Sequence, residues 1–400
     1  MIIFKMQNFN CMKNLFRLLL FQVLLISCSQ SKQETDLSNQ IGNTLVRLEK
    51  IDSVRIGFLG NPIVQDIDSN SETVLFTEPG NYSEDIYVTD FDGNIIHSYT
   101  KFGDLPDTYG VLFAPLKIVG GNEFLAYGIN GLLTYDFSGQ LLSRIKIQDI
   151  QPYNFAKKSM GFSLGILEEG FLYFDQGSRN IDYSDRRLYE EVNAMVLIDK
   201  TSGKREELMN IPESSLYRNG KYFYRDAWAP IFELTEDELL VVYGADPKIY
   251  VHEKTRPFRL IREIPLDIPD YNFYAGEDVY NPDSFLNYFS HGRIETITKI
   301  NGYFILGYFP GYGPQDLATS KENNSPEEWQ AFRERMLKKY PHKVVIFDSK
   351  GDLINDFVPS NVDPRNIIQR DGQLWAMGKM DMEIERDYFM VYKLELKLED

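Results

Sequence analysis

The sequence predicts an all-β protein, a six-bladed β-propeller built from four-stranded antiparallel blades. The first observation is a recurring hairpin, in which two runs of β-branched and aromatic residues flank a short polar turn, as in IYVTDFDGNIIHSY at 86–99. The second is that another pair of apolar strands precedes each hairpin, which gives four strands per unit. The third is composition, since 25 Tyr and 27 Phe favour strands over helices. The hairpins begin at Ile86, Leu132, Val196, Ile249 and Val344.

The N-terminal residues carry the pattern of a targeting segment. In MKNLFRLLLFQVLLISC, residues 12–28, two basic residues precede an apolar run that ends in Leu25-Ile26-Ser27-Cys28. This resembles a bacterial lipoprotein signal, whose Cys becomes the lipidated first residue, and the run is too short to span a bilayer as a helix. We expect residues 1–27 to be a signal peptide and Cys28 to anchor the protein to a bacterial membrane, the outer membrane being the preferred assignment. An ordinary secretory signal or a short membrane anchor is the alternative.

The remaining chain divides into a tether and one domain. Residues 28–43 are polar and predict a flexible tether that reaches roughly 20 Å, followed by a propeller domain at 44–400. The formal net charge of −17, without a basic block, argues against nucleic acid as a partner. Since Cys11 lies in the predicted signal peptide, the mature chain would hold Cys28 alone, and no intrachain disulfide is possible.

The units in order predict how the ring closes. The last unit, at 365–380 and 388–398, supplies three strands and then the chain stops. A strand at 44–51 is left over at the other end, so we expect it to complete the last blade and remove an open sheet edge. The acidic residues that open successive hairpins, Glu253 and Asp348, are 95 residues apart. We interpret that interval as one blade with long insertions, and a seventh blade is the alternative.

One helix is predicted inside blade five. Ser325, Pro326 and Glu328 have the types expected of an N-cap, a first helical residue and a reciprocal capping acid. Trp329, Phe332 and Met336 would share one face, and Pro341 ends the pattern. The helix should lie between the second and third strands of its blade.

The long connections predict one elaborate face. In a four-stranded blade, the loops from strand two to three and from strand four to the next blade emerge on the same side, and the long connections at 102–112, 175–192, 212–228, 269–293 and 310–342 all fall there. Aromatic residues and Arg are enriched in binding hot spots, and long loops on a rigid scaffold often carry function. The candidate binding residues are Tyr109, Arg186, Tyr224, Arg225, Trp228, Tyr274, His291, Arg293 and Tyr312. Many of these side chains could instead pack the loops together.

Three patterns resemble catalytic or metal sites. Gly161-Phe162-Ser163-Leu164-Gly165 matches G-x-S-x-G, but turn and strand residues follow where the nucleophile elbow needs a helix. The alternating oxygens of Asp66, Asp68 and Asn70 resemble a calcium loop, yet Ser71 replaces its glycine, so a solvated turn is the better interpretation. The four His are not at metal-ligand spacing, and His291 is the one worth testing as an acid or base. No metal, phosphate-binding loop or cofactor is expected.

Taken together, the lipobox, the hairpin-terminated units and the Asp-x-x-Gly turns resemble the six-bladed propeller lipoproteins of the Bacteroidetes. The most similar family is a domain of unknown function, DUF4221, a TolB-like propeller, and the resemblance covers about 44–398. It implies a fold, a lipid anchor and a location in the cell envelope, but it brings no catalytic residues. Metal-dependent lactonases are also six-bladed, and no matching ligand set can be identified here by spacing.

These observations support a lipid-anchored binding module whose aromatic and Arg-rich loop face holds a glycan, a peptide or another envelope protein. The alternative is a channel-mouth hydrolase or lyase, lactonase-like and with a metal or His291, which requires inward-facing acids around one point. A third possibility is a structural subunit of an outer-membrane assembly, which would show an apolar patch in place of a pocket.

Overall fold

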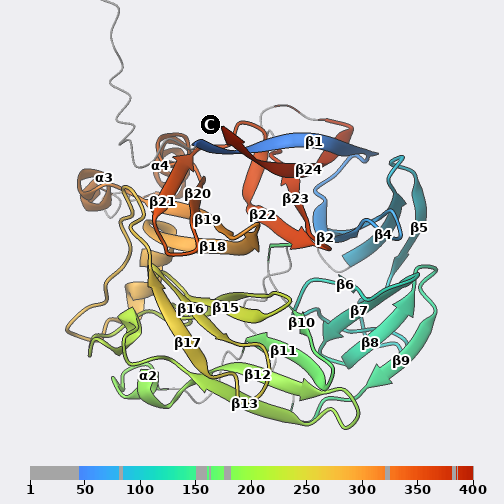
Figure 1. Cartoon of the computed structure of the whole chain (residues 1–400), viewed down its shortest axis with the longest axis horizontal. Helices are drawn as coiled ribbons and strands as arrows, with labels where there is room; N and C mark the ends of the chain where they lie inside the picture. The colour runs from blue at the N-terminus through green and yellow to red at the C-terminus, as the bar shows by residue number, and fades with distance from the viewer. Residues whose placement is uncertain are drawn as a thin grey trace, which may run out of the picture. The chain divides into compact units, whose positions relative to one another are not determined.

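The computed structural model describes residues 45–80, 84–149, 160–161, 164–174, 182–319, 325–380, 384 and 386–399. Within these residues, six four-stranded antiparallel sheets are arranged as blades of a ring (Figure 1). The predicted fold, with six blades, is confirmed. The predicted signal peptide (1–27), the tether (28–43) and the lipidation residue Cys28 lie outside the described residues.

In blades one to five the strands follow sequence order from the innermost strand outward, and blade six adds the first strand of the domain as its outermost strand. Blade one holds β2 (Ile63–Asp68), β3 (Thr73–Pro79), β4 (Glu84–Asp90) and β5 (Ile95–Thr100); blade two holds β6 (Lys117–Ile118), β7 (Glu123–Gly128), β8 (Gly131–Asp136) and β9 (Leu141–Ile145). Blade three holds β10 (Gly165–Ile166), β11 (Gly170–Phe174), β12 (Asn193–Asp199) and β13 (Arg205–Asn210); blade four holds β14 (Pro230–Leu234), β15 (Glu238–Tyr243), β16 (Lys248–Glu253) and β17 (Leu260–Pro265). Blade five holds β18 (His291–Ile300), β19 (Tyr303–Gly311), β20 (Lys343–Phe347) and β21 (Leu353–Phe357); blade six holds β22 (Val362–Arg370), β23 (Gln373–Gly378), β24 (Tyr388–Glu399) and β1 (Leu45–Gly57).

The first strand closes the last blade, as predicted. β1 pairs with β24 from Leu45 opposite Glu399 to Gly57 opposite Tyr388, with one irregularity between Lys50 and Asp52. The strand is longer than the expected segment 44–51, because pairing continues past this irregularity as far as Gly57. The ring is therefore held shut by a long antiparallel ladder between the two ends of the domain.

The Asp-x-x-Gly turns of blades one, two and five, and a turn one residue longer in blade three, join each of these blades to the one before it. In blade one, the Asp90 carboxylate accepts a hydrogen bond from the backbone N–H of Asn94 at 2.8 Å, and Gly93 has φ of 87°. A Cβ atom at Gly93 would lie 2.0 Å from the carbonyl oxygen of Arg55 in β1, so a side chain cannot be accommodated where the turn packs on the outer strand of blade six. Equivalent close approaches are those of Gly139 to Tyr99, Gly203 to Lys146 and Gly351 to Ile264. The repeated motif thus serves the packing of blades.

Blade four makes the same contact with a different chemistry. Its hairpin lacks this glycine, and Arg256 instead forms an ion pair with Glu206 on β13 of blade three, with an N–O distance of 2.8 Å. Phe258 is buried in the core beneath this turn. The irregular hairpin is therefore attached by charge and by an apolar anchor.

The β9–β10 connection reaches the centre of the ring. The Met160 N–H donates to the carbonyl of Val64 on β2 at 3.0 Å, and Met160 is buried. A Cβ at Gly161 would lie 2.4 Å from the carbonyl oxygen of Arg365 on β22 and 2.5 Å from Thr296 Cγ2 on β18. This part of the connection therefore contacts blades one, five and six, although it joins blades two and three. Gly161 of the G-x-S-x-G pattern is explained by this close approach, and Ser163 lies outside the described residues.

The guanidinium of an arginine lies beside Asp66 and Asp68, the acids that resemble part of a calcium loop. Arg370 on β22 has its guanidinium nitrogens 3.8 Å from Asp66, 3.9 Å from Asp68 and 3.6 Å from Asp371, and its Nη2 donates to the Ile118 carbonyl at 2.8 Å. These groups link blades six, one and two. Among the described residues, no group of three or more His, Cys, Asp or Glu is arranged to hold a metal ion. Asp66 and Asp68 therefore pair with the side chain of Arg370 and help to join the blades.

Glu233 joins blades four and five in a similar way. From β14, its carboxylate accepts hydrogen bonds from the hydroxyl of Thr298 at 2.8 Å and from the N–H of Lys299 at 2.7 Å, both on β18. Burial raises the pKa of Glu233 to about 7, although these bonds and the charges of Lys117 and Lys299 act in the opposite direction. The folded protein is therefore less stable when Glu233 is ionised than when it is neutral.

The Glu233→Gln substitution should change the pH dependence of stability. A carboxyl whose pKa is raised on folding contributes stability that is complete below its unfolded value near 4.5 and is lost as pH rises through about 7. Relative to the natural protein, the variant should gain roughly 3 kcal/mol of unfolding free energy between pH 4.5 and pH 8, by the conversion of 1.36 kcal/mol per pKa unit. Urea unfolding at both pH values measures this gain.

Glu238→Gln is a control for which the opposite pH dependence of stability is expected. Lys299 and Arg262 pair with Glu238 and, against burial, lower its pKa. Its contribution to stability is present above its unfolded pKa and is lost as pH falls, so this variant should lose more stability at pH 8 than at pH 4.5. A difference for Glu233→Gln that does not vary with pH would contradict the assigned role of Glu233.

Candidate functional site

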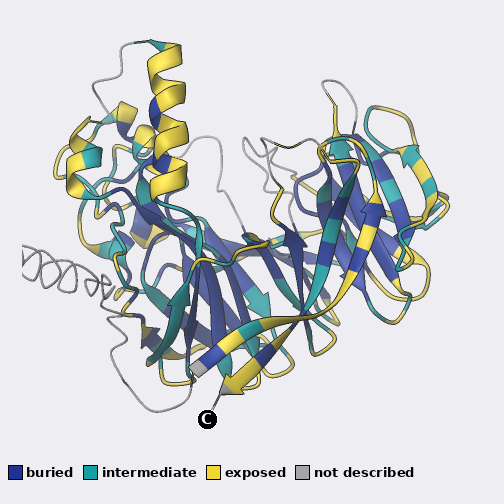
Figure 2. Cartoon of the chain, turned by 90° about the horizontal axis from the view of Figure 1, so that it is seen from above, coloured by how far each residue is buried: buried dark blue, intermediate teal, exposed yellow. Residues whose placement is uncertain are grey.

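The long connections emerge on one face of the ring, which we call the loop face. They are the predicted ones: β5–β6, β11–β12, β13–β14, β17–β18 and β19–β20. Helix α4 (Pro326–Lys339) stands on this side, whereas the C-terminal end of β24 lies at the opposite side (Figure 2). The opposite connections include the short turns Asn301–Gly302 and Asp371–Gly372. The prediction of one elaborate face and one plain face agrees with the sheet topology.

The predicted helix is present, but its aromatic residues are divided between two environments. The Ser325 hydroxyl accepts from the N–H of Glu328 at 3.1 Å, as expected of an N-cap. Phe332 and Met336 are buried, and Phe332 packs against the ring of Tyr312. Trp329 does not share this burial, since it is 37% exposed. Short helices α2 (Leu188–Glu191), α3 (Pro314–Thr319), η1 (Leu216–Arg218) and η2 (Pro282–Phe289) were not predicted.

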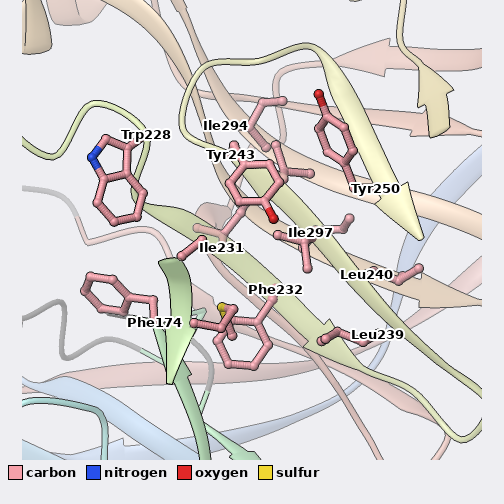
Figure 3. Close-up of a cluster of buried hydrophobic side chains, with 14 of the residues drawn as sticks. Phe174, Trp228, Ile231, Phe232, Leu239, Leu240, Tyr243, Tyr250, Ile294 and Ile297 are labelled. Carbon is pink, nitrogen blue, oxygen red and sulfur yellow. The ribbon is translucent and has the colours of Figure 1, made fainter. Parts of the chain in front are cut away.

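Four of the candidate binding residues are buried. Trp228 and Tyr109 are fully buried, and Tyr274 and Tyr312 are nearly so. Trp228 belongs to the core cluster that also holds Ile231 (Figure 3). Such rings fold the loops onto the blades, which is the packing role that the sequence left open for them. They offer a ligand little or no surface.

Arg293 lies between two rings at the start of β18. Its guanidinium carbon is 4.5 Å from the ring centroid of Tyr288 and 4.9 Å from that of Phe309, which is within the range of cation–π attraction. Its Nε donates to Glu295 at 2.8 Å, and its Nη1 donates to the Tyr288 carbonyl at 2.9 Å. Burial acts to lower the pKa of Arg293, but the Glu295 carboxylate together with Tyr288 and Tyr224 more than offsets this, and the net shift is upward. Arg293 therefore fixes the position of Tyr288.

His291 and Tyr224 support the same loop. The His291 Nδ1 is 3.2 Å from the carbonyl oxygen of Asn287 in η2, and its ring packs edge-on against Tyr274 with centroids 5.4 Å apart. Tyr224 contacts Tyr274 and, at 6.3 Å, Tyr288. The structure thus brings Tyr224, Tyr274, His291 and Arg293 together beneath η2. His291 is positioned to hold the end of this short helix.

Arg186 and Arg225 are exposed on the loop face. The Arg186 guanidinium lies over Tyr222 at 4.6 Å and donates to the carbonyl of Asp278 at 2.5 Å. Arg225 lies 5.9 Å from the ring of Tyr183 and 3.6 Å from the Asp226 carboxylate. These two arginines remain candidates for contact with a ligand.

The candidate binding residues predicted from the sequence do not include a group of exposed apolar side chains on the loop face. They lie before and within η2, and we call them, together with Trp329, the aromatic surface: Val279, Tyr280, Phe285, Leu286, Tyr288, Phe289 and Trp329. Val279, Phe285 and Leu286 are 75%, 50% and 55% exposed. Phe289 packs edge-on against Trp329 with centroids 6.2 Å apart, which joins η2 to α4. The helical signal was present, since Asn281 caps η2 and Pro282 follows it, but η2 is a short 3-10 helix.

The described residues include no helix long and apolar enough to cross a membrane. The loop face instead presents clustered apolar side chains on connections held by guanidinium–ring contacts. The chain is therefore a β-propeller with exposed apolar side chains on its loop face.

No protein-family model and no curated protein matches the sequence. Among solved structures, a member of the DUF4221 family from Bacteroides vulgatus is similar, with a TM-score of 0.63 and 10% identity over 88% of this chain and 99% of that chain. A WD40 domain of Pan2 from Neurospora crassa scores 0.43 with 9% identity (86% and 95% covered), and a gluconolactonase from Xanthomonas campestris scores 0.40 with 11% identity (88% and 90% covered). The TM-scores of these last two structures are too low to support any inference about function. The resemblance to DUF4221 propellers is confirmed at the level of the fold.

Proposed function

We propose that this protein is a docking module that binds another protein through the aromatic surface. The observation that carries the proposal is the exposure of large apolar side chains on adjoining segments, η2 with its preceding residues and α4. Exposed apolar side chains that occur singly are ordinary, but a contiguous group of them marks an interaction site. The contacts of Arg293 and His291 beneath η2 hold this group in place before a partner arrives, which reduces the entropy lost on binding.

A protein partner fits these side chains better than a glycan does. Sugars stack on the faces of Trp and Tyr and hydrogen-bond to polar groups around them. Val279, Phe285 and Leu286 are the most exposed members and offer no hydrogen bond. A second protein can cover such aliphatic groups with its own apolar residues, and the cores of protein interfaces have this composition.

The enzymatic alternative has weaker support. Inward-facing acids are present, but Asp66 accepts from the backbone N–H of Ile118 at 2.8 Å and Glu233 accepts from that of Lys299, so both are engaged in joining blades. The contacts of Met160 and Gly161 also occupy part of the ring centre. The geometry therefore favours binding at the loop face over chemistry in a channel.

The double substitution Phe285→Ser with Leu286→Ser tests the proposed function. Because a few central apolar residues carry most of the energy of an interface, it should weaken partner binding by about 100-fold or more. A photo-crosslinking residue placed at position 289 of the full chain in its own cells should trap the partner, and its affinity can then be measured by calorimetry.

Leu260→Ser with Ile261→Ser is the matched control. This neighbouring pair on the outer strand β17 is 40% and 52% exposed, similar to Phe285 and Leu286. Both double variants should keep their melting temperatures nearly unchanged. Equal loss of crosslinking or affinity in the two variants, or none in the Phe285 and Leu286 variant, would refute a docking role for the aromatic surface.

We also propose that the protein is a lipoprotein of the cell envelope, anchored through Cys28. Support comes from the sequence Leu25-Ile26-Ser27-Cys28 and the polar segment 28–43. Residues 28–43 would then join the lipidated Cys28 to the propeller domain.

Cys28→Ser should abolish lipidation. Cells fed an alkyne-bearing fatty acid should label the natural protein and not the variant, because the thiol of the first mature residue carries the lipid. The variant should also leave the membrane fraction. Cys11→Ser is the control, since residue 11 would be removed with the signal peptide, and labelling that survives in Cys28→Ser would exclude this anchor.

A further inference from the structure

We infer that the partner's docking segment is acidic, with Asp or Glu side chains placed around apolar residues. This inference rests on the proposed function and adds the chemistry of the partner. It arises from the arginines that flank the aromatic surface, and from the way each guanidinium is held.

Arginines lie over rings at both ends of the aromatic surface. At one end Arg186 lies over Tyr222, whose ring packs against Tyr280 with centroids 5.9 Å apart. At the other end Arg333, on α4, lies 5.4 Å from the ring of Trp329. Arg293 stacks on Tyr288 between them. The apolar side chains are thus bordered by cations that come from blades three and five.

Among the described residues, the two outer arginines are not neutralised by a carboxylate. Arg186 bonds to a backbone carbonyl of Asp278, and in the described part of the chain no carboxylate is paired with Arg186 or with Arg333. Arg293, by contrast, pairs with Glu295. The positive charge available to a partner therefore lies at the two ends of the aromatic surface, in a protein whose net charge is −17.

A guanidinium that lies on a ring is well prepared to bind a carboxylate. The ring covers one face and limits the rotamers, while the N–H donors at the edge point outward and match the two oxygens of Asp or Glu. Exposed lysines would lack this fixed geometry. The combination of an apolar centre and a fixed cation at each end is complementary to an apolar segment with acids near its ends.

Peptide selection against the full chain tests this chemistry without a known partner. A random dodecapeptide library displayed on phage should yield sequences that combine aromatic or aliphatic residues with Asp or Glu. A synthetic peptide of this type should lose roughly 10-fold in affinity for each of Arg186→Glu and Arg333→Glu, since a charge-assisted hydrogen bond contributes about that factor. A peptide with Lys in place of its acids should bind the doubly substituted protein better than the natural one.

Two neighbouring arginines serve as controls. Arg187 follows Arg186 but is paired with Asp185, and Arg335 lies on α4 near the ring of Phe332. The substitutions Arg187→Glu and Arg335→Glu should leave peptide affinity within about twofold, because neither borders the aromatic surface. Equal effects of all four substitutions would show a general charge effect and overturn the inference.

The outcomes separate this inference from the proposed function. Selected peptides without acids, which need Phe285 and Leu286 but bind the arginine variants normally, would overturn the acidic partner and leave the docking role intact. Absence of enrichment, or peptides indifferent to Phe285→Ser with Leu286→Ser, would count against both. Stronger binding to phosphatidylglycerol vesicles than to any peptide, dependent on the same arginines, would identify a lipid surface and overturn the protein partner.

Discussion

Replacing Trp228 with alanine is expected to lower the free energy of unfolding by about 3–5 kcal/mol, the range measured when a buried large aromatic ring is removed from a core. Trp228 is fully buried in the cluster that joins blades two, three, four and five. In the described part of the chain its indole N–H has no acceptor, so packing supplies its contribution. Trp228→Phe should recover most of the loss. Urea unfolding followed by circular dichroism measures both changes.

Trp329→Ala is the matched comparison for Trp228→Ala. Trp329 is 37% exposed on α4, where it contacts Phe289. Its removal should change the stability by no more than about 0.5 kcal/mol, as is usual for surface positions, but it should weaken binding of the partner. If instead Trp329→Ala lost stability and Trp228→Ala lost only binding, Trp329 would be the core residue and Trp228 the surface residue.

The two tryptophans show how far the sequence could predict the site. Strand periodicity and turn chemistry define the blades, because each depends on local residues such as Asp90 and Gly93. Inside a long loop no period separates buried from exposed rings. Trp228 and Trp329 both lie in or beside such connections, and their surroundings are set by side chains from other blades. Residue type therefore predicted an aromatic-rich face but could not identify which rings remain accessible.

The centre of the ring was likewise beyond local reasoning. The spacing of Asp66 and Asp68 resembled a calcium loop, but their cation, Arg370, is about 300 positions away and comes from another blade. Gly161 attracted attention through a catalytic pattern, whereas its absent side chain permits contact with Arg365. Both features arise only when the ring closes and brings distant strands together. The sequence therefore drew attention to Asp66, Asp68 and Gly161, but it could not predict which residues they contact.

Arg370→Met should produce a second large loss of stability, about 3–5 kcal/mol at pH 7, the usual cost of breaking a buried charge interaction on one side. The substitution keeps the length of the side chain but removes the cation beside Asp66, Asp68 and Asp371. Asp66 is 1% exposed, so water replaces the lost charge poorly. The hydrogen bond to the Ile118 carbonyl in blade two is lost as well. In this variant, the contact between blades six, one and two should therefore be the first part of the ring to separate during unfolding.

The pH dependence of Arg370→Met separates charge from packing. Burial raises the pKa of Asp371, so protonation of Asp371 should relieve repulsion among the carboxylates, and the deficit relative to the natural protein should shrink as pH falls from 7 toward 4. Arg370→Lys should retain part of the stability, and Asp68→Asn combined with Arg370→Met should cost less than the sum of the two changes, because the sites are coupled. Guanidinium chloride would screen these charges, so urea is the appropriate denaturant. Additive losses that do not vary with pH would mean that Arg370 acts by packing alone.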